Sequence, residues 1–154
     1  MSYPHVRLFG GEHDKPTIED GVTIGVGTGV GQNTYIGKNA RIGKHCKIMQ
    51  HVTICKDAVI GDRVFIGPNS SLYNDKYPPT RVSQSPIIED GAIICGGARI
   101  GPGVIVHRDA VAGMGANVIR DIPEGEVWVG NPARYHMSRG EYNRRQRILT
   151  ESLS

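Results

Sequence analysis

A six-residue repeat constrains this chain more than any other feature of its sequence. Counting by sixes from Ile18, every position as far as Leu72 is a large aliphatic residue, and the count resumes from Ile88 to Val118 with aliphatic residues and one alanine. The residue four places after each of these, except Leu72 where the repeat breaks, is small or β-branched. Neither the helical period of 3.6 nor the two-residue alternation of a strand fits this pattern. The repeat predicts an all-β parallel β-helix, in which each hexad makes a short strand and a turn and three hexads close one triangular coil.

The repeat divides the chain into three predicted parts. Residues 1–15 form an N-terminal lead-in, residues 16–134 form the β-helix, and residues 135–154 form a basic C-terminal tail or helix. The hexads account for about five coils. Residues 72–87 contain three prolines and break the register, so we expect an external loop there. Residues 141–150 have helical composition, and we expect a short helix that covers the open end of the solenoid.

The composition supports one domain with a core of small and branched side chains. The chain has 154 residues, of which 38% are hydrophobic, and it contains 21 Gly but only two Phe and one Trp. The formal net charge is +3, and the excess lies in the last 21 residues, which hold five Arg against two Glu. A neutral body argues against a nucleic-acid groove, which needs basic residues along a face.

Cysteine usage and the lack of long apolar segments suggest a cytoplasmic protein. Cys46, Cys55 and Cys95 are odd in number and show no CxxC spacing, which fits a reducing environment better than a disulfide framework. The N-terminus lacks the apolar stretch of a signal peptide, and no apolar run is long enough to span a membrane. We therefore expect no membrane partner.

The hexads and two further motifs resemble a known superfamily. The repeats end in residues 129–134 (VGNPAR), and this combination resembles the left-handed β-helix acyltransferases of the hexapeptide-repeat superfamily. Residues 48–54 (IMQHVTI), 65–68 (FIGP) and 74–78 (NDKYP) are similar to segments of N-acetyltransferases that act on nucleotide-linked 3-amino sugars. The resemblance implies left-handed winding, acetyl-CoA as co-substrate, a homotrimer, and active sites between neighbouring subunits.

A polar column provides the first catalytic candidate. Residues one coil apart should stack, which places Asn33, His51 and Asn69 in one column, with the two Asn as substrate-binding candidates. Transfer of an acetyl group to an amine needs a group that receives the amine proton and a donor for the oxyanion. We interpret His51 as the residue that receives this proton or orients the amine. The alternative is a surface residue on a flat sheet, and Asn is common at this position in the related enzymes.

The predicted loop provides the remaining acceptor-side candidates. We interpret Asn74 and Asp75 as catalytic residues that hold the sugar and its amino group, and Tyr77 and Arg81 as substrate-binding residues. Turn chemistry ahead of a proline-rich loop would explain Asn74 and Asp75 without any ligand. In the related enzymes an Arg often follows Tyr-Pro directly, whereas two residues intervene before Arg81 in this chain.

The later hexads and the segment after them provide the predicted coenzyme A site. CoA needs a narrow cleft in which backbone groups approach the pantetheine arm, and small residues leave that room. The cofactor-binding candidates are Gly97, Ala98, Gly115, Ala116, Asn131, Pro132 and Arg134. With Arg139, Arg144 and Arg145, Arg134 would meet the CoA phosphates through charge-assisted hydrogen bonds. Tight β-helix corners and a solvated basic helix are the alternative explanations.

A metal site is not predicted. The γ-carbonic anhydrases, which are built on the same solenoid, need a pair of His five residues apart, whereas His45 and His51 are six apart and His107 has no partner at 112. The favoured function is therefore a metal-free, acetyl-CoA-dependent N-acetyltransferase acting on a nucleotide-linked amino sugar, with a 3-amino sugar preferred, in the synthesis of surface-polysaccharide precursors. A sugar O-acetyltransferase and a non-catalytic β-helix scaffold are the alternatives.

Overall fold

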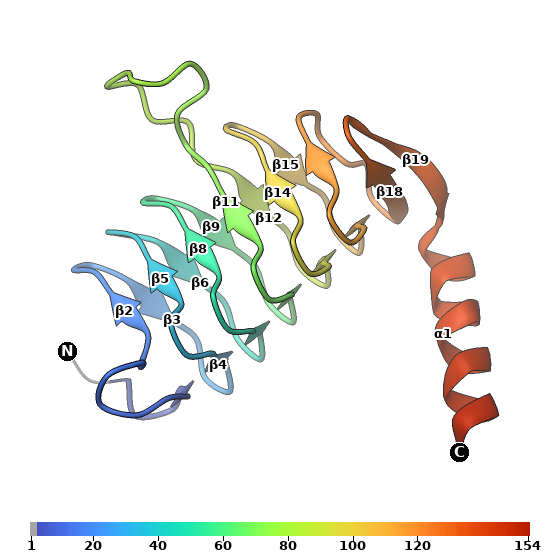
Figure 1. Ribbon diagram of the computed structural model, residues 1–154, viewed down its shortest axis with the longest axis horizontal. Helices are drawn as coiled ribbons and strands as arrows, with labels where there is room; N and C mark the ends of the chain where they lie inside the picture. The colour runs from blue at the N-terminus through green and yellow to red at the C-terminus, as the bar shows by residue number, and fades with distance from the viewer. Residues whose placement is uncertain (1–2) are drawn as a thin grey trace.

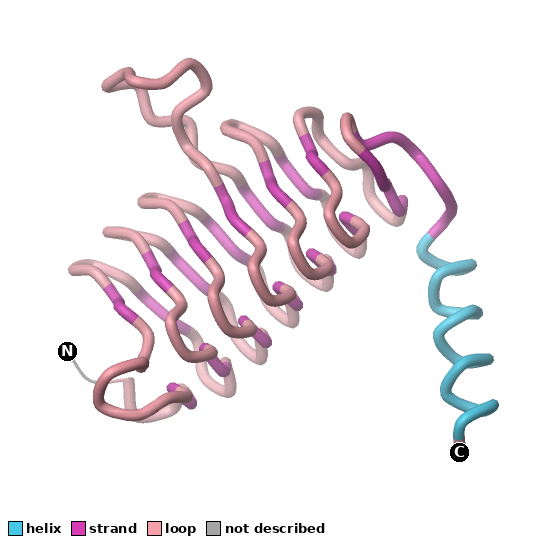
Figure 2. Tube along the Cα trace, in the orientation of Figure 1, coloured by secondary structure: helices cyan, strands magenta, loops and turns pink. Residues whose placement is uncertain are grey.

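The computed structural model describes residues 3–154 and shows a three-sided parallel β-solenoid followed by one helix (Figures 1 and 2). Most strands contain only two residues, because each hexad extends briefly before the chain turns to the next side. The all-β fold predicted from the repeat is confirmed. Left-handed winding stays a prediction of the resemblance.

Three sheets form the sides of the solenoid. Sheet A contains β1 (Arg7–Leu8), β4 (Gly29–Val30), β7 (Lys47–Ile48), β10 (Phe65–Ile66), β13 (Ile93–Ile94), β16 (Val111–Ala112), β18 (Glu126–Gly130) and β19 (Ala133–Ser138). Sheet B contains β2 (Thr17–Ile18), β5 (Tyr35–Ile36), β8 (Thr53–Ile54), β11 (Ser71–Leu72), β14 (Arg99–Ile100) and β17 (Asn117–Val118). Sheet C contains β3 (Thr23–Ile24), β6 (Arg41–Ile42), β9 (Val59–Ile60), β12 (Ile87–Ile88) and β15 (Ile105–Val106).

The register places corresponding hexad residues of successive coils side by side. Ile48 pairs with Val30 on one side and with Ile66 on the other, so the aliphatic residues of one sheet form a continuous inward column. The partner of Ile66 on the next coil is Ile94, which lies beyond the loop. The chain therefore resumes the same register after the loop, and the solenoid continues without a break.

The solenoid has about seven turns in sheet A, so the prediction of about five coils is too low. Segments outside the hexads supply the additional turns. At one end β1 pairs with β4, and at the other end β18 pairs in parallel with β16. The open edge of a sheet can bond any adjacent extended segment through its backbone N–H and C=O groups, whatever the side chains. A count of hexads alone therefore misses these turns.

The predicted aliphatic column forms the core. From Val30 to Val118 every member of the column is at most 4% exposed, and burial of such a side chain contributes roughly 2 kcal/mol. The column of small residues fills the space between the large ones. Its three buried polar members, Thr28, Thr34 and Ser70, each donate a hydroxyl hydrogen bond to a carbonyl of the next coil. These bonds compensate the burial of the hydroxyl groups.

The loop between β11 and β12 comprises residues 73–86 and projects from one corner of the solenoid, as predicted (Figure 1). Within it, the backbone N–H of Gln84 donates to the carbonyl of Asn74 at 2.8 Å, and the Ser85 hydroxyl donates to the carbonyl of Lys56 at 2.6 Å. The loop is therefore closed at its base and is fastened to the coil that precedes it.

The predicted C-terminal helix is confirmed, but it does not cover the end of the solenoid. Strands β18 and β19 form an antiparallel hairpin at that end, and α1 (Arg139–Leu153) follows it without a buried residue (Figure 1). The hairpin supplies hydrogen-bonding groups in the plane of sheet A, which a helix cannot do because its own backbone groups are already paired. No helix within residues 3–154 is long and apolar enough to cross a membrane.

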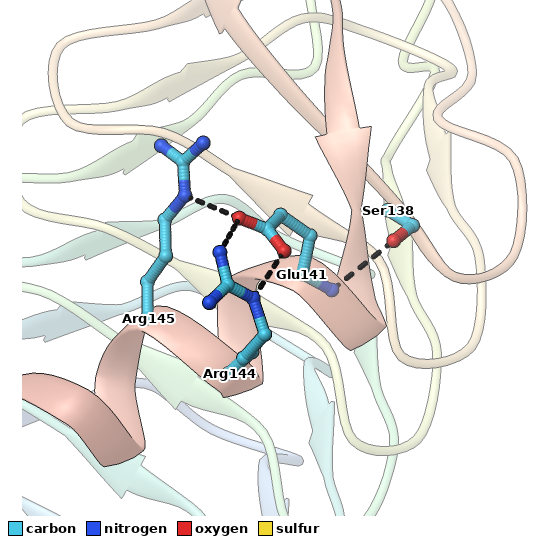
Figure 3. A network of polar contacts seen from close by, with 4 residues as sticks. All are labelled: Ser138, Glu141, Arg144 and Arg145. Atoms are coloured by element: carbon cyan, nitrogen blue, oxygen red, sulfur yellow. Dashed lines mark hydrogen bonds and ion pairs between the residues drawn. The ribbon is translucent and has the colours of Figure 1, made fainter.

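The first turn of α1 is held by side-chain hydrogen bonds and ion pairs (Figure 3). Ser138 is the N-cap, and its hydroxyl accepts the backbone N–H of Glu141 at 3.1 Å. The Glu141 carboxylate then accepts hydrogen bonds from Arg144 and Arg145, each at 2.7 Å. These bonds, first those from Arg144, lower the pKa of Glu141 to about 2.

Candidate functional site

The turns between neighbouring sheets form three edges of the solenoid, and the predicted site residues lie on two of them. We name these edges AB, BC and CA after the sheets that they join. Edge AB carries Asn33, His51 and Asn69, and further along it Gly97 and Gly115. The loop of residues 73–86 leaves from edge BC, because it joins β11 of sheet B to β12 of sheet C.

The residues along edge AB share one backbone conformation. Their φ angles run from 56° at Asn33 and 57° at His51 to 69° at Gly97 and Gly115, all in the left-handed region. Gly adopts this region freely, and Asn is the side-chain residue that tolerates it best. Each backbone N–H donates to a carbonyl of the preceding coil, as from His51 to Gln32 at 3.0 Å and from Gly97 to Pro68 at 2.9 Å. The predicted stacking of Asn33, His51 and Asn69 is thus observed, and the glycine positions continue the same column.

The glycine positions of edge AB leave room beside the backbone. A Cβ atom at Gly115 would have no atom within 4 Å, and one at Gly97 would have only Gly115 atoms at 4.0 Å. Ala98 and Ala116, in contrast, are fully buried in the core, and their N–H and C=O groups are occupied in bonds within the solenoid. Of the four predicted small residues, Gly97 and Gly115 are therefore the ones that present open space to a ligand.

The turn of the β18–β19 hairpin stands at the C-terminal end of edge AB. Its Asn131 Oδ1 accepts a hydrogen bond of 3.0 Å from Asn117 Nδ2 of β17, which fixes the turn that also contains Pro132. Arg134 follows in β19, and its Nη1 donates to the carbonyl of Ala133 at 2.9 Å. The predicted CoA-binding residues of the repeat and of the VGNPAR segment thus lie along one edge.

The other predicted phosphate-binding arginines already have partners in the protein. Arg139 Nη1 donates to the carbonyls of Gly91 at 3.0 Å and of Asp109 at 2.9 Å, which fastens the start of α1 to edge CA. Arg144 and Arg145 bind Glu141 (Figure 3). This leaves Arg134 as the arginine of this group that is placed at the end of edge AB.

The predicted loop residues form hydrogen bonds within the loop. The Asp75 carboxylate accepts from the hydroxyl of Thr80 at 2.6 Å and from its backbone N–H at 2.8 Å, and the hydroxyl is the larger cause of a lowered pKa at Asp75. Asn74 Nδ2 donates to the Ser83 hydroxyl at 2.9 Å. A carboxylate with a lowered pKa is a weak base, so Asp75 is suited to attract an ammonium group and not to accept its proton. Tyr77 and Arg81 are exposed.

Within one chain the structure does not bring the loop residues to His51. Sheet B separates the two, since Asn74 and Asp75 follow β11 at edge BC whereas His51 precedes β8 at edge AB. The sequence motifs that suggested one site thus occupy two corners of the solenoid.

Edge CA carries a pair of side chains that the sequence analysis missed. His107 Nδ1 and Glu89 Oε1 are 2.7 Å apart, and both side chains are about two-fifths exposed. These residues are 18 positions apart. Applying the one-coil spacing to His107, in place of the zinc-type spacing, would have found its partner. Within residues 3–154 no three His, Cys, Asp or Glu side chains gather as a metal site.

The three cysteines of the chain lack the environment of an activated thiol. None forms a disulfide, and Cys46 and Cys55 are buried. Burial is the largest cause of a raised pKa at all three thiols, and the pKa of Cys55 reaches about 11. A thiol nucleophile requires a lowered pKa, so these residues are not candidates for a catalytic nucleophile.

Comparison with known proteins gives matches over the repeat region. Residues 39–74 match the family model of the bacterial transferase hexapeptide (six repeats). A putative acetyltransferase YJL218W of Saccharomyces cerevisiae is 37% identical over 84 residues, which cover 49% of this chain and 43% of that protein. The mitochondrial γ carbonic anhydrase 1 of Arabidopsis thaliana is 37% identical over 79 residues, which cover 50% of this chain and 25% of that protein. The chain thus spans less than half the length of these curated relatives.

Solved structures match more of the chain. WeeI from Acinetobacter baumannii AYE has a TM-score of 0.69 and 32% identity, with 79% of this chain and 55% of that chain covered. PerB from Caulobacter crescentus, solved in complex with CoA and GDP-perosamine, has a TM-score of 0.65 and 24% identity, with 79% and 54% covered. At that identity the likeness to PerB is one of fold.

Proposed function

We propose that this chain, a hexapeptide-repeat protein of the acyltransferase superfamily, transfers the acetyl group of acetyl-CoA to the amino group of a nucleotide-linked sugar. One observation carries the proposal: edge AB aligns the polar column of Asn33, His51 and Asn69 with open space at Gly97 and Gly115. Polar side chains that could bind the amino-sugar acceptor and open positions that could accommodate acetyl-CoA thus lie along the same edge.

The donor half of the proposal is supported by the shape of edge AB. A pantetheine arm is narrow and must lie close to backbone, and the open positions at Gly97 and Gly115 provide such a path. Beyond them, Arg134 stands where the phosphates of CoA would follow, and a guanidinium suits that contact. PerB, which shares the fold, binds CoA and GDP-perosamine, and YJL218W is described as a putative acetyltransferase.

Acetyl transfer from the thioester to the amine requires that the two reactants be positioned and that a group accept the amine proton. The amine nitrogen attacks the thioester carbonyl carbon, the C–S bond breaks, the sulfur leaves with the electron pair, and the nitrogen loses one proton. His51 stands two coils before Gly97, roughly 10 Å along the edge at the usual strand spacing. In this proposal its imidazole orients the amine and receives the proton, and Asn33 and Asn69 on either side bind sugar hydroxyl groups.

The proposal assigns the loop of edge BC to a neighbouring subunit of a homotrimer. Asn74 and Asp75 lie across sheet B from His51 in their own chain, so a second copy is needed to place them in the same site. Sheet C supports this arrangement because it presents Val59, Ile87 and Ile105 outward, and Ile87 is 38% exposed. Packing of this apolar side against another copy would carry the adjacent loop toward that copy's edge AB.

The finer specificity of the proposal is an amine at carbon 3 of the sugar. It rests on the similarity of residues 74–78 (NDKYP) to enzymes that act on 3-amino sugars. Asp75 would hold the amino group in its ammonium form, which gives one proton to solvent before the neutral amine attacks; the second proton, lost as the amide forms, is the one that His51 receives. Tyr77 and Arg81 would contact the remainder of the acceptor.

Two measurements test the proposal. Calorimetry should detect binding of CoA, and a free-thiol assay with UDP- and dTDP-linked 3- and 4-amino sugars should detect acetyl transfer. Absence of CoA binding would contradict the acyltransferase assignment and favour the scaffold alternative. CoA binding with thiol release only in the presence of hydroxyl acceptors would contradict the N-acetyltransferase assignment and favour the O-acetyltransferase.

A further inference from the structure

A hollow of about 340 Å³ lies on the outer side of sheet A in the first three turns of the solenoid, over β1, β4 and β7. It has a simple origin in the register. Arg7, Gly29 and Lys47 occupy equivalent outward positions on these neighbouring strands, and the middle one has no side chain. A Cβ atom at Gly29 would lie in tight contact with the Phe9 ring at 3.3 Å and would be 3.8 Å from the Arg7 carbonyl oxygen. Gly29 thus forms part of the floor of the hollow, and the Phe9 ring stands directly beside it.

The walls of the hollow combine an aromatic ring with two cations. The Phe9 ring is 42% exposed, and the Arg7 guanidinium carbon lies 4.7 Å from its centroid. Met49 lines the hollow farther along. Neither Arg7 nor Lys47 forms an ion pair with a carboxylate anywhere in residues 3–154. The hollow therefore offers a flat apolar surface and positive charge that no carboxylate of residues 3–154 pairs with.

We propose that this hollow binds the nucleoside diphosphate portion of the sugar acceptor, an inference that rests on the proposed function. The base lies on the glycine floor against Phe9 and Met49, because a planar ring gains most from an aromatic wall. The diphosphate lies between Arg7 and Lys47, which bind its oxygens through charge-assisted hydrogen bonds. The sugar then extends toward edge AB.

The position of the hollow selects the acceptor over the donor. CoA also contains a nucleoside diphosphate, so the chemistry alone does not separate the two. Gln32 and Gln50 line the hollow and directly precede Asn33 and His51 on edge AB. The open glycine position at Gly115 lies on the same edge but four coils after Asn33. A nucleotide in the hollow is therefore next to the acceptor column and far from the proposed pantetheine path.

The test uses the full chain and calorimetric titration with UDP, dTDP, GDP and ADP, and separately with CoA. We expect one or more of the diphosphates to bind. The variant Gly29→Val fills the hollow with a side chain that suits a strand. It should weaken diphosphate binding at least about tenfold, which corresponds to about 1.4 kcal/mol, and should leave the affinity for CoA unchanged. Thr17→Val, at an exposed outward strand position on sheet B, is the matched control and should change neither affinity.

A second variant keeps the test independent of any effect of Gly29→Val on folding. Phe9→Ala removes the half-exposed aromatic wall and should also weaken diphosphate binding alone. Binding of CoA without binding of any diphosphate would overturn this inference and leave the acyltransferase proposal standing. Diphosphate binding that survives both variants would overturn it as well, and loss of CoA binding in Gly29→Val would assign the hollow to the donor. Failure of both CoA and the diphosphates to bind would contradict the proposed function itself.

Discussion

Edge AB and the loop at edge BC hold their candidate residues in different ways. On edge AB each candidate occupies one repeated turn position, and its backbone is bonded to the preceding coil, as from Gly115 to Gly96 at 3.0 Å. In the loop, Asp75 is held mainly by a single neighbouring residue, Thr80, through two hydrogen bonds. The positions on edge AB are therefore set by the regular coil spacing, whereas those in the loop are set by hydrogen bonds within the loop.

The difference shows which substitutions separate folding from function in each region. On edge AB the column itself demonstrates that Asn, His and Gly all fit the turn, so exchanging one for another preserves the fold. In the loop the same side chains serve the turn and the proposed chemistry. A test there needs a variant that breaks the turn bonds but keeps the charge.

The largest effect is expected at His51. The variant His51→Asn places on edge AB a residue that the column already accepts at Asn33 and Asn69, with φ angles between 56° and 62°. Loss of a proton acceptor should lower kcat/KM by about a hundredfold, measured with acetyl-CoA and the best acceptor. A loss of less than about threefold, which is smaller than general-base catalysis contributes, would exclude His51 as the base.

The next largest effect is expected at Gly115. In Gly115→Asn the new side chain enters the open space of edge AB while the backbone keeps a conformation that Asn tolerates. CoA affinity should fall at least about tenfold, whereas the melting temperature should stay within roughly 3 °C. Gly125→Asn, at another turn with φ 71° and no atom within 4 Å, is the control. Equal loss of CoA affinity in both variants would show that edge AB has no special role.

A smaller effect is expected in the loop, where Asp75→Asn should lower kcat/KM for the amine about fivefold and leave CoA binding unchanged. The variant replaces a charged hydrogen bond by a neutral one, which is weaker by roughly 1 kcal/mol. Thr80→Val breaks the hydroxyl bond to Asp75 but retains the carboxylate, so it should preserve most of the activity. If the two variants lose activity equally, Asp75 acts only in the turn. Because the pKa of Asp75 is lowered, its charge persists through the usual titration range of Asp near about pH 4, and activity should not decline through this group until the pH falls below that range.

The smallest effect concerns Glu141, which lies outside both regions. Its pKa is lowered to about 2 in the folded protein, so its ion pairs stabilise α1 above the usual Glu pKa and are lost as the pH falls toward 2. Glu141→Gln should therefore reduce helix content or melting temperature slightly at pH 7, and the difference from wild type should shrink in acid. Circular dichroism at both pH values measures this. A difference that grows on acidification contradicts the assigned direction.

The fold could be predicted from the sequence because the repeat determines both burial and register. The column from Val30 to Val118 needed no knowledge of distant contacts, since each hexad obeys the same rule. The turns made by β1 and β18 could not be found in this way, because these strands lie outside the hexad pattern and pair with the exposed edges of sheet A. For the same reason the sequence did not show that the β18–β19 hairpin, and not α1, covers the end of sheet A.

The candidate site was predictable only where the repeat extends. Spacing predicted the column of Asn33 and His51, and the same rule would have revealed Glu89 beside His107. The spacing rule alone could not show that the loop and His51 lie on different edges. That conclusion also requires each hexad to be assigned to one side of the solenoid. The hollow at Gly29 was missed because a missing side chain leaves no pattern in the aliphatic column.

The most direct test mixes two impaired variants in one preparation. Gly115→Asn obstructs edge AB, and Asp75→Asn weakens the loop, so each variant alone retains only part of the wild-type activity. If each site combines edge AB of one subunit with the loop of another, about one site in four of a random mixture is assembled from two intact parts. These sites alone should contribute about one quarter of wild-type activity, so the co-expressed subunits should be clearly more active than the mean of the two separate variants. Activity no higher than the mean of the two separate variants would contradict a site shared between edge AB and a neighbouring loop.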